Sequence, residues 1–248
     1  MKEKKGSQKR FVNKLLICYN IRMEKYFTEY GIVLNEKQKE QFKRYCELLI
    51  EYNERFNLTA ITEKREIYIK HFIDSALAVE LLKGENLADV GSGGGFPALP
   101  LKIIKPELEV TLIEATEKKC EFLKEVVGQL GLTGVKVVCG RAEDLAKNPD
   151  YREKFDICTA RAVARLNVLA EYCLPFVKKG GIFVAYKGDA DDELKEAEKA
   201  FKILGGMVIN YEKYVLEGAK RSVIIVEKQK NTDVKYPRSN ARIKNKPL

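Results

Sequence analysis

The stretch Asp89-Val-Gly-Ser-Gly-Gly-Gly-Phe-Pro-Ala-Leu-Pro100 places three glycines at alternate positions between two apolar runs. Without side chains at Gly91, Gly93 and Gly95, the backbone can turn sharply and can approach a bound molecule closely. A glycine loop between a short apolar strand and a helix is typical of proteins that bind nucleotides or related cofactors. The loop alone leaves the ligand open.

Downstream of this loop, strand-like apolar runs alternate with amphipathic segments. Alternating strands and helices predict an open, mostly parallel sheet covered by helices on both faces. The last two strands follow each other without a helix, which predicts an antiparallel hairpin at one sheet edge. This outline resembles a class I methyltransferase domain, an α/β Rossmann-like fold with seven strands. The predicted strands are 87–91, 110–114, 135–139, 155–160, 182–186, 207–214 and 222–227, and the helices of this region are 96–105, 117–130, 163–178 and 190–204.

Upstream of the loop, apolar residues recur at helical spacing over 36–56 and 66–82. We therefore expect an N-terminal helical region over residues 23–84 and the methyltransferase-like domain over 85–230. Residues 1–22 are expected to be a basic, disordered extension, and residues 231–248 a basic C-terminal tail.

The net charge of +9 is concentrated at the two ends of the chain. Residues 1–22 and 228–248 each carry +6, and the remainder carries −3. Such ends are typical of segments that contact a polyanion such as RNA, although charged ends can also simply favour solubility.

The six cysteines form no C-x-x-C pair, and the chain has one histidine, so we expect no metal site. Cys139 and Cys158 lie in apolar, strand-like runs, where a free thiol is expected to pack as a small hydrophobic side chain. No apolar run is long enough to span a membrane. We expect a cytoplasmic monomer.

The pattern around the glycines favours S-adenosylmethionine over a dinucleotide. The dinucleotide fingerprint has a third glycine for helix packing at the position of Phe96, and phenylalanine is too large for that role. The GK[ST] ending of a phosphate-binding loop is absent. The string Asp-x-Gly-x-Gly-x-Gly that begins at Asp89 is found in S-adenosylmethionine enzymes. Glu114 ends the second strand 19 residues after Gly95, where its carboxylate can accept hydrogen bonds from both ribose hydroxyls.

Two later loops complete the expected site. Residues 140–144 follow the third strand, where methyltransferase folds contact the adenine edge. Arg161 ends the fourth strand and replaces the Asn/Asp-Pro-Pro-Tyr signature of enzymes that methylate exocyclic amines. A ring nitrogen with a free lone pair needs positioning and no general base, so this absence favours a ring-nitrogen acceptor. Lys187 ends the fifth strand, where its ammonium could contact a phosphate or a base.

His71, Asp74 and Ser75 share one helix face. With no second histidine and no suitable nucleophile, a catalytic triad is hard to build. Either a structural hydrogen-bond network or a lining of the ligand cleft would explain them.

Together the motifs resemble the bacterial 16S ribosomal RNA guanine-N7 methyltransferases, the glucose-inhibited division protein B family. The resemblance covers Met23 to Leu248. Where the family motif has Gly-Ile, this chain has Ala98-Leu99. The matching strings are Asn57-Leu-Thr-Ala-Ile61, His71-Phe-Ile-Asp-Ser75, Asp89-Val-Gly-Ser-Gly-Gly-Gly-Phe-Pro97, Arg161-Ala162, Tyr186-Lys187-Gly188, Tyr236-Pro-Arg238 and Lys246-Pro-Leu248.

The resemblance implies methyl transfer from S-adenosylmethionine to N7 of guanine 527 (rRNA numbering) in the 530 loop of 16S RNA. The partner would be that RNA or the small ribosomal subunit. Arg161 and Lys187 would position substrate or cofactor, with no general base. Including the glycine loop, the expected cofactor-binding residues are Gly91, Gly93, Gly95, Phe96, Glu114, Ala115, Thr116, Ala142, Glu143 and Arg161.

Two other functions remain open from the sequence. The same scaffold could methylate another RNA or a small molecule, or it could bind an adenosine nucleotide or RNA without catalysis.

Overall fold

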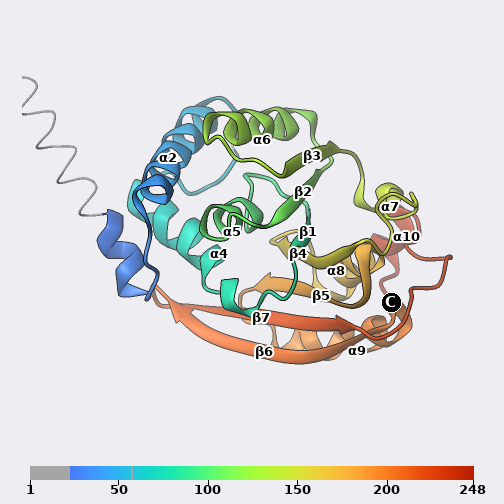
Figure 1. Cartoon of the computed structure of the whole chain (residues 1–248). Helices are drawn as coiled ribbons and strands as arrows, with labels where there is room; N and C mark the ends of the chain where they lie inside the picture. The colour runs from blue at the N-terminus through green and yellow to red at the C-terminus, as the bar shows by residue number, and fades with distance from the viewer. Residues whose placement is uncertain (1–22, 57) are drawn as a thin grey trace, which may run out of the picture.

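The computed structural model describes residues 23–56 and 58–248. The segment 1–22, for which the sequence predicts disorder, lies outside the described residues. In the described part, seven strands form one sheet in the order β3-β2-β1-β4-β5-β7-β6 (Figure 1). Their bounds are β1 (Asn86–Val90), β2 (Glu109–Glu114), β3 (Val135–Cys139), β4 (Phe155–Arg161), β5 (Val177–Lys187), β6 (Gly206–Leu216) and β7 (Ala219–Lys228).

Strands β1 to β5 pair in parallel, whereas β7 pairs antiparallel with both β5 and β6. The predicted fold is therefore confirmed: a seven-stranded, mostly parallel sheet with an antiparallel hairpin at one edge. The hairpin strands are longer than expected, and β5 begins at Val177, five residues before the start predicted for it.

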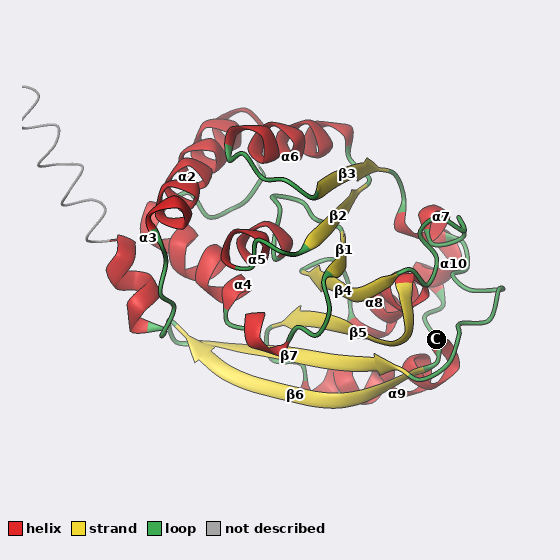
Figure 2. Cartoon of the chain, in the orientation of Figure 1, coloured by secondary structure: helices red, strands yellow, loops and turns green. Residues whose placement is uncertain are grey.

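Helices cover both faces of the sheet (Figure 2). Helices α2, α4, α5 and α6 lie on one side, and α8, α9 and α10 lie on the other (Figure 1). Residues 23–29 are also helical. The bounds are α2 (Glu36–Phe56), α3 (Lys64–Ile67), α4 (Asp74–Ala76), α5 (Ala98–Ile104), α6 (Glu117–Gln129), α7 (Ala142–Leu145), α8 (Leu166–Cys173), α9 (Asp191–Leu204) and α10 (Asn240–Asn245).

The apolar side chains form two cores, one on each face of the sheet. Successive residues of a strand point to opposite faces. Accordingly, Phe183 packs in the core under α8 and α9, while its neighbour Val184 packs in the core under α2 and α5. Because both faces are covered, the central strands β1 and β4 are buried at almost every position.

The region 66–82, expected to be one helix, is interrupted. It comprises α3, a π-helical segment (Tyr68–Ile73), α4, and a 3₁₀ turn (Val79–Leu81). Five of the six π-helical residues are buried, so this segment packs on more than one side, which a one-sided periodicity does not indicate. π-helical turns occur frequently at functional sites.

Three further expectations need correction. The helix predicted over 163–178 begins only at Leu166, because the preceding residues form a loop, and a 3₁₀ turn (Leu174–Phe176) follows it. The short helices α7 and α10 were not predicted, since neither has enough residues to show a period. Cys139 is exposed, because it ends β3, the edge strand of the sheet.

The strand order reverses between β1 and β4, because β1 lies between β2 and β4. In open α/β sheets, ligands bind at this switch point beyond the carboxyl ends of the strands. The glycine loop follows β1 and Arg161 ends β4, so the topology brings both to this place.

Candidate active site

The glycine loop bends around the end of β2. Gly91, Gly93 and Gly95 have φ values of 71°, 56° and 94°, in the left-handed region that favours glycine. The N–H groups of Gly91 and Ser92 both donate to the carbonyl of Ile113, at 2.9 and 3.2 Å. The loop is thus fastened to the neighbouring strand before the chain enters α5.

The three glycines have different neighbours. A Cβ at Gly91 would lie 2.6 Å from the Val163 side chain, and one at Gly95 would lie 2.5 Å from Leu99. A Cβ at Gly93 would meet only a backbone oxygen at 3.7 Å. Packing therefore requires two of the glycines, whereas the space above Gly93 is open.

Asp89 lies beneath the loop and is fully buried. Its Oδ1 accepts a hydrogen bond from the Thr159 hydroxyl at 2.7 Å, whereas Oδ2 has no partner. Burial raises the pKa of Asp89 to about 7. Below about pH 7 the Asp89 carboxyl group is therefore mostly protonated in the folded protein.

Glu114 connects the loop to the end of β2. Its two carboxylate oxygens accept from the N–H groups of Gly93 and Thr116, each at 2.9 Å. A carboxylate oxygen has two lone pairs, so Glu114 can still accept hydrogen bonds from a ligand. The Glu114 side chain is thus held in place in the wall of a cavity.

This first cavity has a volume of about 350 Å³. Glu114 and Glu143 provide carboxylates, while backbone and small side chains form most of the remaining wall. Its lining residues are Val90, Gly91, Ile113, Glu114, Ala115, Thr116, Lys119, Gly140, Arg141, Ala142, Glu143, Ala162, Val163, Ala164, Tyr172, Asn240 and Lys244.

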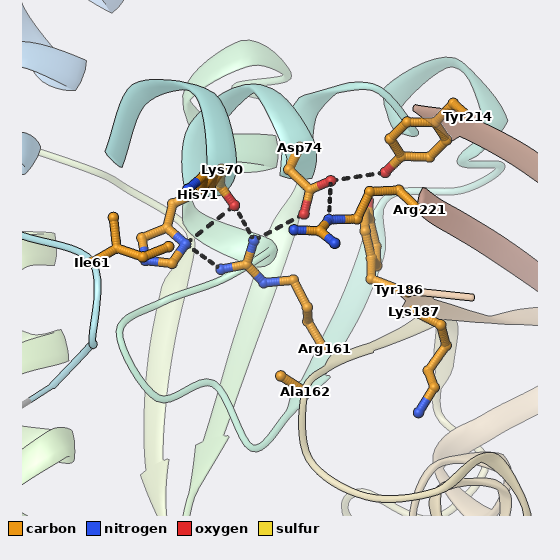
Figure 3. A pocket seen from close by; sticks show the side chains of 11 residues that line it. Ile61, Lys70, His71, Asp74, Arg161, Ala162, Tyr186, Lys187, Tyr214 and Arg221 are labelled. Atoms are coloured by element: carbon orange, nitrogen blue, oxygen red, sulfur yellow. Dashed lines mark hydrogen bonds and ion pairs between the residues drawn. The ribbon is translucent and has the colours of Figure 1, made fainter. Parts of the chain in front are cut away.

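A second cavity of about 320 Å³ lies on the other side of Ala162, which lines both. Figure 3 shows its side chains, which come from the π-helical segment, α4 and the ends of β4 to β7. Cations outnumber carboxylates on its walls. The lining residues are Ile61, Lys70, His71, Asp74, Arg161, Ala162, Tyr186, Lys187, Gly188, Tyr214 and Arg221.

Arg161 is the centre of a hydrogen-bond network in the second cavity (Figure 3). Its Nη1 donates to the carbonyl of Lys70 at 3.1 Å and to Asp74 Oδ2 at 3.3 Å. Its Nη2 lies 3.0 Å from His71 Nδ1, and its guanidinium carbon lies 4.8 Å from the centre of the Phe96 ring. Burial lowers the pKa of Arg161, and Asp74 opposes this effect. Several contacts thus fix one guanidinium in one orientation.

His71 is neutral and acts as an acceptor here. Burial, together with the charge of Arg161, lowers the pKa of His71 to about 3. Because a guanidinium can only donate, His71 Nδ1 must accept and Nε2 must carry the hydrogen. Nε2 lies 2.9 Å from the Thr59 hydroxyl, which accepts that hydrogen. The imidazole ring also stacks on Phe96, with 4.4 Å between centroids.

Asp74 bridges the helical region and the edge hairpin. Its Oδ1 accepts from the Tyr214 hydroxyl at 2.9 Å and lies 3.7 Å from Arg221 Nε. Tyr214 and Arg221 are directly paired across β6 and β7. One carboxylate therefore orients two arginines.

Ser75 belongs to the structure beneath this network. It is fully buried, donates to the carbonyl of His71 at 2.6 Å, and its own carbonyl accepts from the Tyr186 hydroxyl at 3.0 Å. The sequence left open whether these residues form a structural network or line a ligand cleft. His71 and Asp74 do both, since they join the network and line a cavity. Only the structural reading applies to Ser75.

Lys187 points away from the network (Figure 3). Its ammonium lies 2.8 Å from Glu193 and donates to the carbonyl of Ala164 at 3.0 Å. Lys187 therefore anchors the loop after β4 as well as lining the second cavity.

Ala162, between the cavities, has a φ of 56°. A non-glycine residue in the left-handed region carries backbone strain, and such strain is found often at functional sites. The contacts of Arg161 on one side and the anchored Ala164 on the other hold this conformation.

The structure thus divides the predicted site residues between several places. Phe96 is buried against Arg161 and His71. Neither Phe96 nor Gly93 nor Gly95 lines either cavity. Arg161 and Lys187 line the second cavity. The other predicted cofactor residues, Gly91, Glu114, Ala115, Thr116, Ala142 and Glu143, line the first.

The sequence analysis missed several lining residues, because they come from segments that lie far from the glycine loop along the chain. Val163, Tyr172, Asn240 and Lys244 line the first cavity, and Tyr214 and Arg221 line the second. Pairing the two hairpin strands around Gly218 would have placed the last two side by side. Nothing local in the sequence indicates the others.

Two kinds of feature are absent from the described part of the chain. No three His, Cys, Asp or Glu side chains among residues 23–56 and 58–248 gather into a group able to hold a metal ion. None of the described helices is long and apolar enough to cross a membrane.

Comparisons with known proteins identify the family of this chain. The chain is 50% identical over 236 residues to the ribosomal RNA small subunit methyltransferase G of Lactobacillus helveticus, which covers 91% of this chain and 98% of that protein. It is 51% identical over 225 residues to the protein of the same name from Leuconostoc mesenteroides, covering 88% and 94%.

More distant structures share the fold alone. P. horikoshii TYW2 in complex with MeSAdo has a TM-score of 0.51 at 18% identity, covering 63% of this chain and 61% of that one. The YcgJ protein of Bacillus subtilis also has a TM-score of 0.51, at 16% identity, covering 65% and 100%.

The family model for rRNA small subunit methyltransferase G (GidB) matches residues 38–224. The chain therefore belongs to this family of ribosomal RNA methyltransferases.

Proposed function

We propose that this enzyme methylates N7 of guanine 527 in the 530 loop of 16S ribosomal RNA. The main support is that two cavities meet at the strained residue Ala162. The first cavity would suit a nucleoside-like cofactor, and the second is basic. The family supports ribosomal RNA as the substrate, and the resemblance of the motifs supports the guanine and the loop.

The cofactor is S-adenosylmethionine, which supplies a methyl group bound to a sulfonium sulfur. Glu114 would accept the ribose hydroxyls, and the loop at Ala142 and Glu143 would hold the adenine edge. Gly91 and the open space over Gly93 would admit the rest of the cofactor. The reactive end would then lie toward Ala162, at the entrance to the second cavity.

The second cavity is built to hold a base that needs no deprotonation. Its histidine and its carboxylate are held by neighbouring donors, since His71 Nδ1 and Asp74 Oδ2 accept from Arg161 and Asp74 Oδ1 accepts from Tyr214. These contacts orient both groups toward the protein and disfavour either as a general base. N7 of guanine attacks with a lone pair, so alignment is the main requirement. Arg161 and Arg221 offer remaining N–H groups to the guanine O6 or to phosphates.

The test is labelling with S-adenosylmethionine carrying a radioactive methyl group. Small ribosomal subunits that lack the modification and free 16S RNA would be incubated with the enzyme, and the label would be mapped by chemical cleavage at N7-methylguanine. We expect label at guanine 527. Label elsewhere in the RNA, or only in small molecules, would refute the proposed acceptor and favour the alternative.

Two further properties belong to this proposal. A cytoplasmic monomer suits a substrate as large as a ribosomal subunit, because one site must reach a loop in a folded RNA. Light scattering with size separation would measure the mass, for which 28.3 kDa is expected.

A further inference from the structure

The C-terminal tail (231–248) lies against the methyltransferase domain. Glu171 of α8 is fully buried, and its carboxylate accepts from Arg238 Nε at 2.9 Å and from Arg238 Nη2 at 2.6 Å. Ile243 of α10 is also fully buried. A buried, two-point arginine–carboxylate pair fixes both position and orientation.

A second anchor lies just upstream. The guanidinium of Arg152 donates to the carbonyls of Thr232 and Tyr236, at 2.7 and 2.9 Å. Thr232 in turn donates its N–H to Glu153 at 2.7 Å. The tail is therefore attached at both ends of the segment that leads into α10.

This attachment places one face of α10 in the wall of the first cavity. Asn240 and Lys244 both line that cavity, and residues four apart lie on the same face of a helix. The hydroxyl of Tyr172, which also lines it, donates to Asn240 Oδ1 at 2.8 Å. Because Tyr172 occupies the amide oxygen, the Asn240 amide nitrogen remains as a donor.

The position within the cavity indicates which part of the ligand these donors meet. Figure 1 shows α10 beside α7. Burial raises the pKa of Tyr172, and the nearby Glu143 carboxylate of α7 raises it further. Tyr172 therefore lies close to α7. The α7 end is the end assigned above to adenine, whose ring nitrogens are hydrogen-bond acceptors.

We propose that Asn240, oriented by Tyr172, and Lys244 bind the adenine ring of the cofactor, so that the tail forms part of the cofactor site. This role rests on the proposed use of the first cavity. It gives a cofactor-binding role to a basic segment whose charge alone suggested contact with RNA or a contribution to solubility.

The test is binding of S-adenosylhomocysteine, measured by calorimetry without RNA. Y172F, N240A and K244A are each expected to weaken binding about three- to tenfold, the effect of losing one hydrogen bond. K246A, a lysine two residues further on that does not line the cavity, is the matched control and should bind as the wild type. Thermal unfolding by circular dichroism checks that each variant is folded.

Deaza analogues, in which one adenine ring nitrogen is a carbon, separate contact from structure. For at least one analogue, the loss of affinity relative to S-adenosylhomocysteine should be smaller in N240A than in the wild type. In N240A the amide that would donate to that ring nitrogen is already missing. Wild-type affinity in both Y172F and N240A would overturn the proposal. An equal loss in K244A and K246A would overturn the role of Lys244. If these affinities behave as expected but the RNA is not methylated, the proposed function is contradicted and the role of the tail is not.

Discussion

Replacing Asp89 by Asn should make the protein more stable, and this gain should grow as the pH rises from 5 to 8. Asn imitates the protonated carboxyl group, since it is neutral and can still accept from the Thr159 hydroxyl. It places an amide nitrogen where Oδ2 already lacks a partner. The two proteins therefore differ mainly when Asp89 is ionised.

The magnitude follows from the raised pKa. Burial raises the pKa of Asp89 from 3.8 to about 7. Between these values the folded state keeps the proton and the unfolded state releases it. The free energy of unfolding therefore falls as the pH rises through this window, by about 1.4 kcal/mol per pH unit. The whole window of roughly three pH units corresponds to at most about 4 kcal/mol, and the part of it between pH 5 and pH 7 to about 3 kcal/mol, which the wild type loses and Asp89→Asn retains.

The assay is urea denaturation of both proteins at several pH values between 5 and 8. Circular dichroism is the suitable signal, because the chain has no tryptophan. The low pKa of His71, about 3, makes a contribution of the opposite sign, lost as the pH falls below 6.5, but it is common to both proteins. A difference that does not change with pH, or a less stable variant at pH 8, would refute the reasoning.

Three more predictions concern the site. Gly93→Asp should abolish S-adenosylhomocysteine binding in calorimetry, because a charged side chain enters the open space of the loop. The control Gly128→Asp, on an exposed helix face, should bind as the wild type. Equal affinities of the two variants would contradict the placement of the loop at the cofactor. Deletion of residues 1–22 should leave this affinity unchanged, and a loss would show that the extension contributes to the site. Arg161→Lys should lower kcat for RNA methylation by more than tenfold, because one ammonium cannot replace separate contacts made by a planar guanidinium; a normal kcat with a raised KM would show a role in binding only.

The main outline of the fold was predictable because periodicity reports burial. Residues 110–114, 135–139 and 155–160 are apolar runs between turn signals, and each is a strand within a residue of its predicted bounds. The π-helical segment was not predictable, because its burial on several sides comes from packing against other elements. The exposure of Cys139 likewise depends on which strand lies at the sheet edge.

By itself, the sequence determined the type of each main element, the glycine loop and the acidic residue that ends β2. These are local properties, set by backbone freedom at Gly93 and by the spacing of apolar residues. Only the tertiary structure decided which distant side chains meet. Arg161 contacts His71 and Asp74 from 87 to 90 residues away, and α10 reaches the first cavity from the end of the chain. Such contacts depend on strand order and on anchors such as Arg238 and Glu171, which leave no periodic trace in the sequence because each rests on a single pair of side chains.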